Sequence, residues 1–449
     1  MIKNQDCLAH LKETEGKTYH TIFADPPYNL GSSVFIDKDG KPKFKGTAKD
    51  FMNKWQFGHE EWETFFKESF RVLKCGGYLV LYGMDRQEFL LKYYAVLAGF
   101  TECQSLYWYF LSNFPKATDT SKMIDKRLGF DREVVGNIDS RSIYDNCLRT
   151  SNGKNNKTFA GTKYGKTNIT APASPQADLF DGYKYSIAPL KQVVETILVF
   201  RKPPKNGSVL NDLMQWQDDD ISPALINVDG ERVDTKGEKV ENTQPLNGKP
   251  KFNGNEKCNN RKKYYSPPGF YSEATIKGRY PAQLFCDDGC GEILDRQSGI
   301  LKNGGQNKTS DRTAKEHHIF KVNSPVTNHA GNTGGCSRIL HKCNYDSSEL
   351  ELLQYCTKAS QKERHSGLEG KNPHPTIKPI ELNKHIAGLF KLPPECNQRW
   401  YLPFNGAGSE EIALRLLGVP EQNIDATEIS SEYIEVRNQR IKFYLGNNE

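Results

Sequence analysis

The sequence lacks a hydrophobic run long enough to cross a membrane. A transmembrane helix needs about 20 consecutive apolar residues, and this chain of 449 residues has no run of about 18 or more. Hydrophobic residues make up 36% and charged residues 26% of the sequence, which is typical of a soluble globular protein. We therefore expect no membrane association, and the length suffices for two or three domains.

A strong excess of charge of one sign is also missing. The 61 Lys and Arg residues and the 55 Asp and Glu residues leave a net charge of +6. So mild a basic bias permits a nucleic-acid partner but does not require one. The 11 cysteines are scattered and no signal peptide precedes them, which favours reduced thiols in a cytoplasmic protein over disulfides.

Close cysteine pairs of the kind that bind zinc are scarce as well. Cys286 and Cys290 are separated by three residues, but no second close pair accompanies them. Further side chains that could complete a structural zinc site are Cys336, Cys343, His317, His318 and His341. Because the spacing is loose, free thiols are the simpler interpretation, and we expect no metal site.

What the sequence does contain, near its start, is the motif Asp25-Pro26-Pro27-Tyr28 after the apolar, strand-like residues 21–24. Two prolines donate no N–H and fix φ, so they end a strand and would hold their neighbours rigidly at its carboxyl end. Open α/β sheets bind their ligands at that end. Asp25 and the Pro26 carbonyl could accept hydrogen bonds from an exocyclic amino group, and a nucleobase could stack on Tyr28. The alternative is a proline-rich turn with a capping aspartate.

Helix and strand patterns alternate through the next part of the chain. Residues 62–73 are spaced like a buried helix face, which Gly76-Gly77 would end. Residues 29–51 are rich in Gly and Lys, and we expect a loop that stays mobile until substrate arrives. Further segments are predicted as a helix at 88–97 and strands at 78–82, 104–111 and 192–200. This alternation indicates a mainly parallel sheet covered by helices.

The end of the chain carries a second motif. The predicted segments are a helix at 380–390, a strand at 400–402, a glycine-rich turn at 403–409, a helix at 410–417 and a strand at 424–427. Glycines let a nucleotide-like ligand approach the backbone, and an acidic residue about 20 positions later can bind ribose hydroxyls. Glu428 follows Gly406 by 22 positions, so the spacing fits such a site.

The middle of the chain, residues 205–345, has weak periodicity and high polarity. We interpret it as an inserted region that faces the substrate. Basic residues here and in the polar segment 151–170 could contact phosphates: Lys154, Lys157, Lys163, Arg261, Lys262 and Lys263. The alternative is that these side chains are only solvated.

Four motifs together resemble those of the DNA methyltransferases that methylate amino groups. The similar segments are Asn4–Cys7, Asp25–Leu30, His374–Pro379 and Phe404–Ser409. Their order, with the Asp-Pro-Pro-Tyr motif first and the cofactor motif last, resembles the permuted β class of this family. The family transfers the methyl group of S-adenosylmethionine to adenine N6 or cytosine N4.

The resemblance implies an α/β fold with a Rossmann-like sheet of seven strands and a circularly permuted motif order. It implies a catalytic part at 1–204, an inserted target-recognition region at 205–345 and a cofactor-binding part at 346–449. The implied substrate is adenine in double-stranded DNA, because Asp rather than Ser begins the motif. A cytosine-N4 enzyme, an RNA or protein-glutamine methyltransferase and an inactive DNA-binding module remain alternatives. A bacterial or phage origin, a homodimer and a companion restriction endonuclease are compatible with the resemblance.

The resemblance also implies roles for particular residues. The catalytic residues would be Asp25, Pro26, Pro27 and Tyr28. The residues that would bind S-adenosylmethionine are Asp6, Cys7, Asp25, Thr376, Lys378, Pro403, Phe404, Asn405, Gly406, Gly408, Ser409 and Glu428. One departure is Leu402, where the family usually has Asp, and Glu410 or Asp25 could supply the missing carboxylate. His374 is expected to be structural.

Overall fold

The computed structural model describes residues 2–27, 33–40, 42–45, 57–83, 85–110, 117–139, 166–186, 188–233, 280–286, 288–303, 332–334, 341–342, 359, 361–368, 370, 372–374 and 377–446. The chain divides into two compact units. The first unit consists of residues 1–227, 283–290 and 341–449, and the second of residues 228–282 and 291–340. Within the described residues, no helix is both long and apolar enough to span a membrane.

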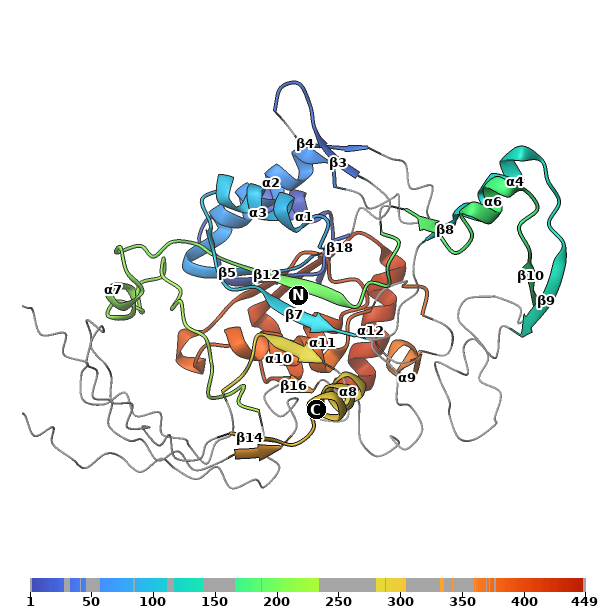
Figure 1. Cartoon of the computed structure of the whole chain (residues 1–449). Helices are drawn as coiled ribbons and strands as arrows, with labels where there is room; N and C mark the ends of the chain where they lie inside the picture. Colours follow the sequence, from blue (N-terminus) through green and yellow to red (C-terminus); the bar gives the residue numbers. More distant parts are fainter. Residues whose placement is uncertain are drawn as a thin grey trace, which may run out of the picture. The chain divides into compact units, whose positions relative to one another are not determined.

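The first unit is built on a sheet with ten strands among the described residues (Figure 1). Nine of them follow one another in the spatial order β1 (Ile2–Asn4), β18 (Ile424–Glu428), β17 (Trp400–Leu402), β2 (Tyr19–Ala24), β5 (Leu73–Gly83), β12 (Val194–Arg201), β7 (Leu106–Tyr109), β13 (Leu284–Cys286) and β16 (His341–Lys342). The tenth strand, β6 (Thr101–Glu102), pairs with β12. The first and last parts of the sequence therefore meet in one sheet.

All neighbouring pairs along this order are parallel except those that involve β12, which is antiparallel to both β5 and β7. The seven strands from β1 to β7 form the predicted Rossmann-like α/β sheet. β13 and β16 extend it from residues that we had assigned to the inserted region at 205–345. The first unit also includes residues 205–227, so the boundaries of the compact units differ from the predicted ones at both ends of that region.

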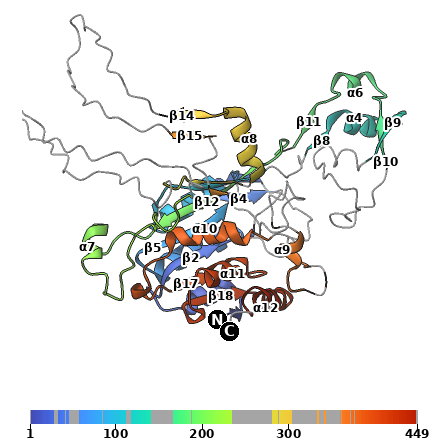
Figure 2. The ribbon, with the colours of Figure 1, turned by 90° about the horizontal axis from the view of Figure 1, so that it is seen from below.

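Two groups of helices cover the sheet (Figure 1), and Figure 2 shows the second of them. The first group consists of α1 (Cys7–Glu13), α2 (His59–Val72) and α3 (Glu88–Leu97). The second group consists of α10 (Ile380–Phe390), α11 (Ser409–Leu416) and α12 (Ser431–Leu445). Helices α3 and α10 have the predicted bounds, because their apolar residues recur with the spacing of a helix face.

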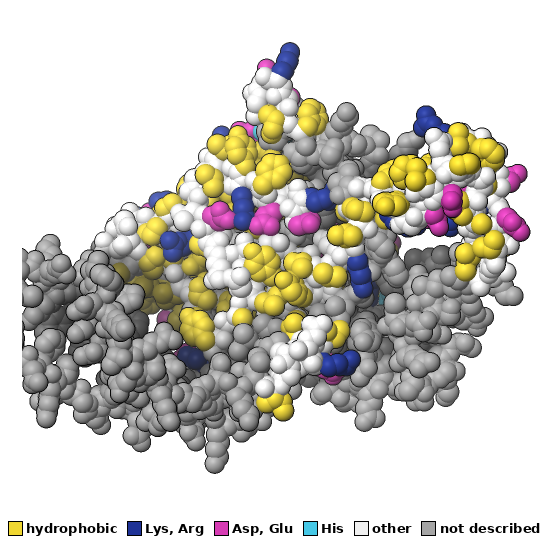
Figure 3. Space-filling model, viewed as in Figure 1, with side chains coloured by type: hydrophobic (Ala, Val, Ile, Leu, Met, Phe, Trp, Pro, Cys, Tyr) yellow, Lys and Arg dark blue, Asp and Glu magenta, His cyan; other side chains and the backbone are white. Residues whose placement is uncertain are grey.

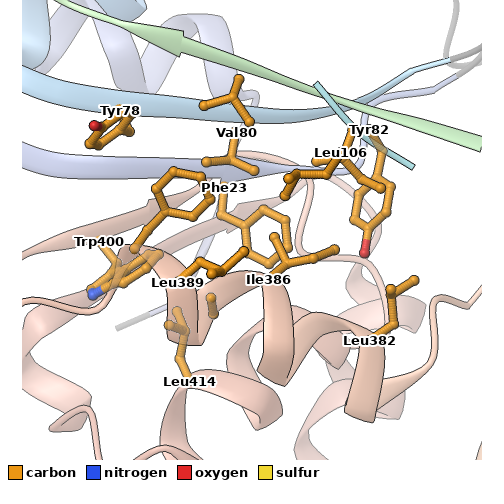
Figure 4. Close-up of a cluster of buried hydrophobic side chains, with 14 of the residues drawn as sticks. Phe23, Tyr78, Val80, Tyr82, Leu106, Leu382, Ile386, Leu389, Trp400 and Leu414 are labelled. Carbon is orange, nitrogen blue, oxygen red and sulfur yellow. The ribbon is translucent and has the colours of Figure 1, made fainter. Parts of the chain in front are cut away.

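Alternate residues of the central strands serve opposite faces of the sheet, because side chains of a strand alternate in direction. On β2, Ile22 and Ala24 pack in the cluster of the first helix group, whereas Phe23 packs in the cluster of the second. On β5, Val80 and Tyr82 face the second group (Figure 4). In Figure 4, Phe23, Val80 and Leu106 of the sheet lie opposite Leu382, Ile386 and Leu389 of α10. Both faces are apolar, which explains why these strands read as continuous hydrophobic runs.

Gly76-Gly77 does not end helix α2, which was the prediction, but lies inside strand β5. The helix ends earlier, at Val72. A Cβ on Gly76 would lie 2.3 Å from the Ser222 carbonyl oxygen, and φ at Gly76 is +83°. Gly76 therefore permits the close approach of residues 220–222, which bond to Cys75 through backbone hydrogen bonds, whereas a Cβ on Gly77 would lie 2.7 Å from the His20 carbonyl oxygen.

The segment 29–51, predicted as a loop, contains an antiparallel hairpin of β3 (Ser33–Ile36) and β4 (Pro42–Lys45). Other two-stranded pairs are β9 (Val134–Asp139) with β10 (Lys166–Thr170), β8 (Thr118–Asp119) with β11 (Lys184–Tyr185), and β14 (Leu301–Asn303) with β15 (Asn332–Gly334). The remaining helical segments are α4 (Thr120–Leu128), α6 (Pro175–Leu179), α7 (Val209–Leu213), α8 (Asp288–Ser298), α9 (Gln361–His365), η4 (Pro394–Cys396) and η5 (Glu421–Asn423).

Strands β8 to β11 with helices α4 and α6 are held together by a polar cluster. The buried Asp125 accepts hydrogen bonds from Arg132 at 2.7 Å, Ser174 Oγ at 2.6 Å and Ala173 N at 2.9 Å. Large apolar side chains on this segment are exposed instead, namely Leu128, Phe130, Val134, Val135, Leu179, Phe180, Tyr183 and Tyr185. Figure 3 shows hydrophobic side chains gathered on the surface of α4 and α6. Charge and hydrogen bonding, rather than an apolar core, thus stabilise this segment.

Candidate active site

The predicted motifs meet at one edge of the sheet. Asp25 directly follows β2, the glycine-rich turn follows β17, and Glu428 is the last residue of β18. These strands are parallel to one another, so their carboxyl ends lie at the same edge. β1 is parallel to β18, with Asn4 opposite Glu428, so Asp6 also follows a strand at this edge.

Asp25 is paired with Lys378, a residue 353 positions away in the sequence. The Lys378 Nζ atom donates to Asp25 Oδ1 at 2.7 Å and to Oδ2 at 2.8 Å. The side chain of Lys378 is 5% exposed and that of Asp25 is 15% exposed. Burial alone would lower the pKa of Lys378, but the carboxylates of Asp25 and Glu195 raise it above its ordinary value. Lys378 is therefore a protonated ammonium that contacts the predicted catalytic carboxylate.

Two further carboxylates surround this pair. Glu195 on β12 has Oε2 3.5 Å from Lys378 Nζ. Glu410, in the first turn of α11, is buried and accepts a hydrogen bond from Asn383 Nδ2 at 3.1 Å. Burial and the charge of Asp25 raise the pKa of Glu410 to about 7, against the opposing effects of Lys378 and Asn383. The site thus contains one ammonium and three carboxyl groups.

Two uncharged side chains, those of Tyr82 and Asn383, lie next to these charged groups. The Tyr82 hydroxyl donates to Asn383 Oδ1 at 2.6 Å, and Figure 4 shows it pointing toward helix α10. Lys378 Nζ lies 4.6 Å from the centre of the Tyr82 ring, within the range of a cation–π contact. Strand β5 therefore contributes Tyr82, and helix α10 contributes Asn383, to the surroundings of Lys378.

The turn after β17 depends on glycine at two positions. φ is +46° at Gly406 and +77° at Gly408, a region that side chains other than glycine seldom adopt. A Cβ on Gly406 would lie 2.6 Å from His374 Nε2, and one on Gly408 would lie 2.7 Å from Arg437 Cγ. His374 thus packs against the turn, and its ring centre also lies 4.5 Å from that of Tyr433.

Glu428 is fixed by backbone amides. Its Oε2 accepts from Gly406 N at 2.9 Å, and its Oε1 accepts from Ser430 N at 2.8 Å. Burial raises the pKa of Glu428, and these two hydrogen bonds oppose that shift. The carboxylate therefore joins the end of β18 to the glycine-rich turn.

Two arginines of helix α12 contact the same turn. Arg437 pairs with Glu411 through its Nε at 2.8 Å, and Glu411 also accepts from Asn405 Nδ2 at 2.7 Å. The fully buried Arg440 donates to the Ala407 carbonyl at 2.6 Å and to Ser409 Oγ at 3.1 Å. The turn is thus held by ion pairs and hydrogen bonds that involve helices α11 and α12.

The remaining predicted cofactor residues have visible structural contacts. Asp6 caps helix α1, where its Oδ1 accepts from Leu8 N at 2.9 Å and Ala9 N at 3.0 Å. Cys7 is buried, and burial followed by the charge of Asp6 raises the pKa of its thiol. The Pro403 carbonyl accepts from Thr427 Oγ1 at 2.9 Å. The Phe404 ring packs at 5.5 Å from Phe57 and 5.7 Å from Phe65, measured between ring centres.

Several residues that matter to this site were not found from the sequence. Glu195, Asn383, Arg437 and Arg440 had no motif that marked them. Glu195 did carry a signal, because it is a single charge inside the apolar run Gln192–Phe200. Asn383 interrupts the apolar face of α10 in a similar way. A lone polar residue in a segment otherwise expected to be buried needs a partner, and here both partners belong to the site.

Other predicted residues lie outside the described part of the chain. These are Tyr28, Thr376, Lys154, Lys157, Lys163, Arg261, Lys262 and Lys263. Of the residues considered for zinc, Cys286 is buried, Cys290 belongs to α8 and His341 to β16, and the others lie outside the described part. Among the described residues, no group of three or more His, Cys, Asp and Glu side chains is arranged to hold a metal ion.

Comparison with known proteins gives a family match over most of the chain. The model of a family described as "DNA methylase" (N6_N4_Mtase) matches residues 19–436. Among curated proteins, "Type II methyltransferase M.BamHI" of Bacillus amyloliquefaciens is 34% identical over 91 residues. That match spans 20% of this chain and 19% of the relative, so the chain aligns with about a fifth of the relative's length.

Two solved structures were compared with the whole chain. The M1.HpyAVI–SAM complex is 10% identical, with a TM-score of 0.33 and 98% of each chain covered. The PvuII DNA methyltransferase, described as cytosine-N4-specific, is 12% identical with a TM-score of 0.35, over 100% of this chain and 87% of that one. TM-scores below 0.5 do not establish a common fold.

Proposed function

We propose, from the premise that this chain belongs to the DNA methylase family, that it transfers a methyl group from S-adenosylmethionine to N6 of adenine in double-stranded DNA. The observation that carries this proposal is the position of Asp25. Its carboxylate stands at the end of β2, beside the glycine-rich turn and Glu428 at the ends of the adjacent strands. A hydrogen-bond acceptor for an amino group and a turn suited to a nucleotide-like cofactor thus share one edge of the sheet.

Asp25 and the Pro26 carbonyl would act on the target amino group. The lone pair of an adenine amino nitrogen is delocalised into the ring, so this nitrogen is a poor nucleophile. If both of its hydrogens are accepted, the nitrogen becomes more pyramidal and its lone pair becomes available. The sulfonium methyl group is already activated, so in-line transfer requires positioning more than a strong base.

S-adenosylmethionine would lie across the ends of β17 and β18. Gly406 and Gly408 permit the positive φ values of the turn whose backbone would contact the cofactor. Glu428 would accept the ribose hydroxyls through its spare lone pairs, as an acidic residue at a strand end does in nucleotide-binding sheets. Asp6 and Cys7, which follow the neighbouring strand β1, would contribute to the adenine side of the cofactor.

Glu410 is our candidate for the carboxylate that Leu402 does not supply. It is buried beside the site, and it interacts electrostatically with both Asp25 and Lys378. In contrast, Leu402 is buried in the core. A carboxyl group would therefore reach the site from the first turn of α11 instead of from the end of β17.

The target base would leave the duplex to reach Asp25, because a paired adenine does not expose its amino group to an enzyme pocket. Tyr28 would provide the surface on which the extruded base stacks. We further propose that the middle of the chain selects the sequence, and that its basic residues, Arg261, Lys262 and Lys263 among them, contact phosphates. The motif order supports assignment to the permuted β class.

Mass spectrometry of the modified nucleoside tests this proposal. DNA incubated with the protein and S-adenosylmethionine is digested to nucleosides, and N6-methyl-2′-deoxyadenosine should form. N4-methyl-2′-deoxycytidine would instead establish the cytosine enzyme of the same family. DNA that is bound but not modified would support a DNA-binding module without catalysis, and modified RNA would exclude DNA as the preferred substrate.

Charge reversal of Arg261, Lys262 and Lys263 tests the phosphate contacts. The variant should bind all DNA sequences less tightly and show a shallower dependence of affinity on salt, because fewer counterions are released on binding. The same slope for wild type and variant would remove these three residues from the interface.

A further inference from the structure

Lys378 occupies both carboxylate oxygens of Asp25, the residue that would accept the hydrogens of the target amino group in the proposed reaction. Both carboxylate oxygens of Asp25 accept from the ammonium, at 2.7 and 2.8 Å. These are the acceptors that a target amino group would need. The structure therefore places a cationic donor where the proposed substrate would donate its own hydrogens.

We infer that Lys378 is a positioning residue for Asp25, and that Glu195 is the acceptor to which its ammonium turns when a base amino group bonds to Asp25. This inference rests on the proposed function. It assigns Lys378 to the target amino group rather than to the cofactor, which was its predicted partner. It also gives a role to Glu195, which no sequence motif had marked.

The geometry around Glu195 supports such an exchange. Its Oε2 atom is buried and accepts no hydrogen bond from the described residues. Lys378 Nζ lies 3.5 Å from that atom, which is close enough for attraction but longer than an ordinary charge-assisted hydrogen bond. A small rotation of the lysine side chain would shorten this contact while it lengthened those to Asp25. The ammonium can therefore change partners without leaving the site.

Burial makes the ammonium necessary. Lys378 is 5% exposed, and Glu195 is 12% exposed, so neither charge is fully hydrated. The groups that face Lys378 are Asp25 from β2, Glu195 from β12, Glu410 from α11 and the Tyr82 ring from β5. Arg440 on α12 is a second cation that interacts with Glu410. Without Lys378, the negative charges of Asp25, Glu195 and Glu410 would repel one another. The pKa values of these carboxyl groups would then rise.

The test compares Lys378→Met with Lys378→Arg and with the matched control Lys384→Met. Lys384 follows Asn383 on α10, but its side chain is 29% exposed and pairs with Glu381 at 2.7 Å. For Lys378→Met we expect kcat to fall roughly 100-fold, as for a misplaced catalytic group. The Kd for S-adenosylmethionine, measured by calorimetry, should stay within about threefold of wild type. Lys384→Met should behave as wild type, and Lys378→Arg should recover part of the activity.

The pH profile provides a readout that a purely structural role would not change. The acidic limb of kcat should move to higher pH in Lys378→Met and move back in Lys378→Arg. Because Lys378→Met leaves buried carboxylates without a cation, a second variant, Glu195→Gln, tests the inference with little change in shape. It should lower kcat about tenfold and leave cofactor affinity unchanged, since a neutral amide oxygen attracts the ammonium less strongly than a carboxylate does.

Three results would overturn the inference. A Kd for S-adenosylmethionine raised about tenfold or more, with kcat unchanged at saturating cofactor, would make Lys378 a cofactor residue. An unchanged pH profile in Lys378→Met would show that it does not act on Asp25. If Glu195→Gln has the kcat of wild type, the ammonium does not need Glu195 as a second partner, and this part of the inference is wrong. Absence of methyl transfer by the wild type would refute the proposed function itself, and the inference with it.

Discussion

Two carboxylates at the same edge of the sheet, Asp25 and Glu428, are held in opposite ways. Asp25 is held by an ammonium from a segment 353 residues away, and two more carboxyl groups share that ammonium. Glu428 is held by the backbone amides of Gly406 and Ser430, at 2.9 and 2.8 Å. One site is thus organised by side-chain charge and the other by backbone geometry.

The difference teaches what each site can tolerate. A carboxylate held by charge responds to pH and to the loss of its partner, because its environment changes with every nearby titration. A carboxylate held by backbone amides has partners that only a substitution by proline removes, but it depends on the turn that presents them. We therefore expect side-chain changes to dominate at Asp25 and changes of backbone conformation to dominate near Glu428.

The largest effect is expected for Asp25→Ala, which tests the charge-organised side. Methyl transfer should fall by about 1,000-fold or more, because the acceptor for the target amino group is gone. Cofactor affinity should be largely preserved, since the turn and Glu428 are unchanged. Rates measured with tritiated S-adenosylmethionine, together with calorimetry, separate the two quantities. Normal turnover by a folded Asp25→Ala protein would sink the assignment of this residue.

Gly408→Ala tests the backbone-organised side. The new Cβ would meet Arg437 Cγ at 2.7 Å, in a residue whose φ is +77°. We expect a loss of about 2–4 kcal/mol in unfolding free energy from backbone strain and overpacking. Binding of S-adenosylmethionine should weaken in the same variant. The control is Gly182→Ala, at a glycine whose φ of +82° is similar but whose Cβ would meet nothing within 4 Å.

If both alanine variants lose the same stability in urea unfolding, backbone strain alone accounts for the effect. Equal losses would mean that Arg437 moves aside without cost. A larger loss in Gly408→Ala would show that the arginine below the turn is held in place. Its partner Glu411, 2.8 Å from Arg437 Nε, predicts that outcome.

Glu428→Ala should have a smaller effect than the glycine change. It removes the proposed ribose acceptor and leaves two backbone amides without their partner, which costs about 1–3 kcal/mol in cofactor binding. Glu428→Gln keeps one acceptor oxygen and should lose less. Glu421→Ala, at an exposed residue that pairs with Arg415, is the control. A dissociation constant for S-adenosylmethionine equal to that of wild type would show that Glu428 does not bind the ribose.

The sequence predicted the regular elements well where burial repeats with a period. Helices α3 and α10 have the predicted bounds, because their apolar residues recur with the spacing of a helix face. Strand β17 also has the predicted bounds, because its three residues are buried and a glycine-rich turn follows them. The glycine pair in β5 misled the prediction, because Gly76 is there for the approach of residues 220–222, which lie far along the chain. Strand β13, with three residues, is too short to show any period.

In the candidate site too, local motifs predicted some features and tertiary contacts determined the others. The ends of β2, β17 and β18 follow from local motifs, so their residues were predicted together. The partner of Asp25 did not follow, because Lys378 belongs to another motif and only the fold brings the two into contact. Glu195 and Arg440 belong to no motif, and only the tertiary fold brings them to the site. A motif records which residues share a function, but not which of them contact one another.

The smallest effect is expected at the opposite end of strand β2, where His20 contrasts with Asp25. Its Nδ1 accepts from Arg399 N at 3.0 Å, and burial together with the charges of Lys74 and Arg399 lowers the pKa of His20 to about 3. Its pKa when folded lies below that of an unfolded histidine, about 6.5. The associated stability is therefore present above pH 6.5 and is lost progressively as the pH falls toward 3.

His20→Asn should remove this dependence and keep an acceptor for Arg399 N. Between pH 7 and pH 6, wild type should lose about 0.7 kcal/mol more unfolding free energy than the variant, because only the unfolded wild type gains a proton at residue 20. Urea unfolding of both proteins at the two pH values measures this difference. Parallel losses would mean that His20 titrates alike in both states. The expected result would place a pH-dependent term of stability at the amino end of β2, whereas the pH dependence of activity belongs to its carboxyl end.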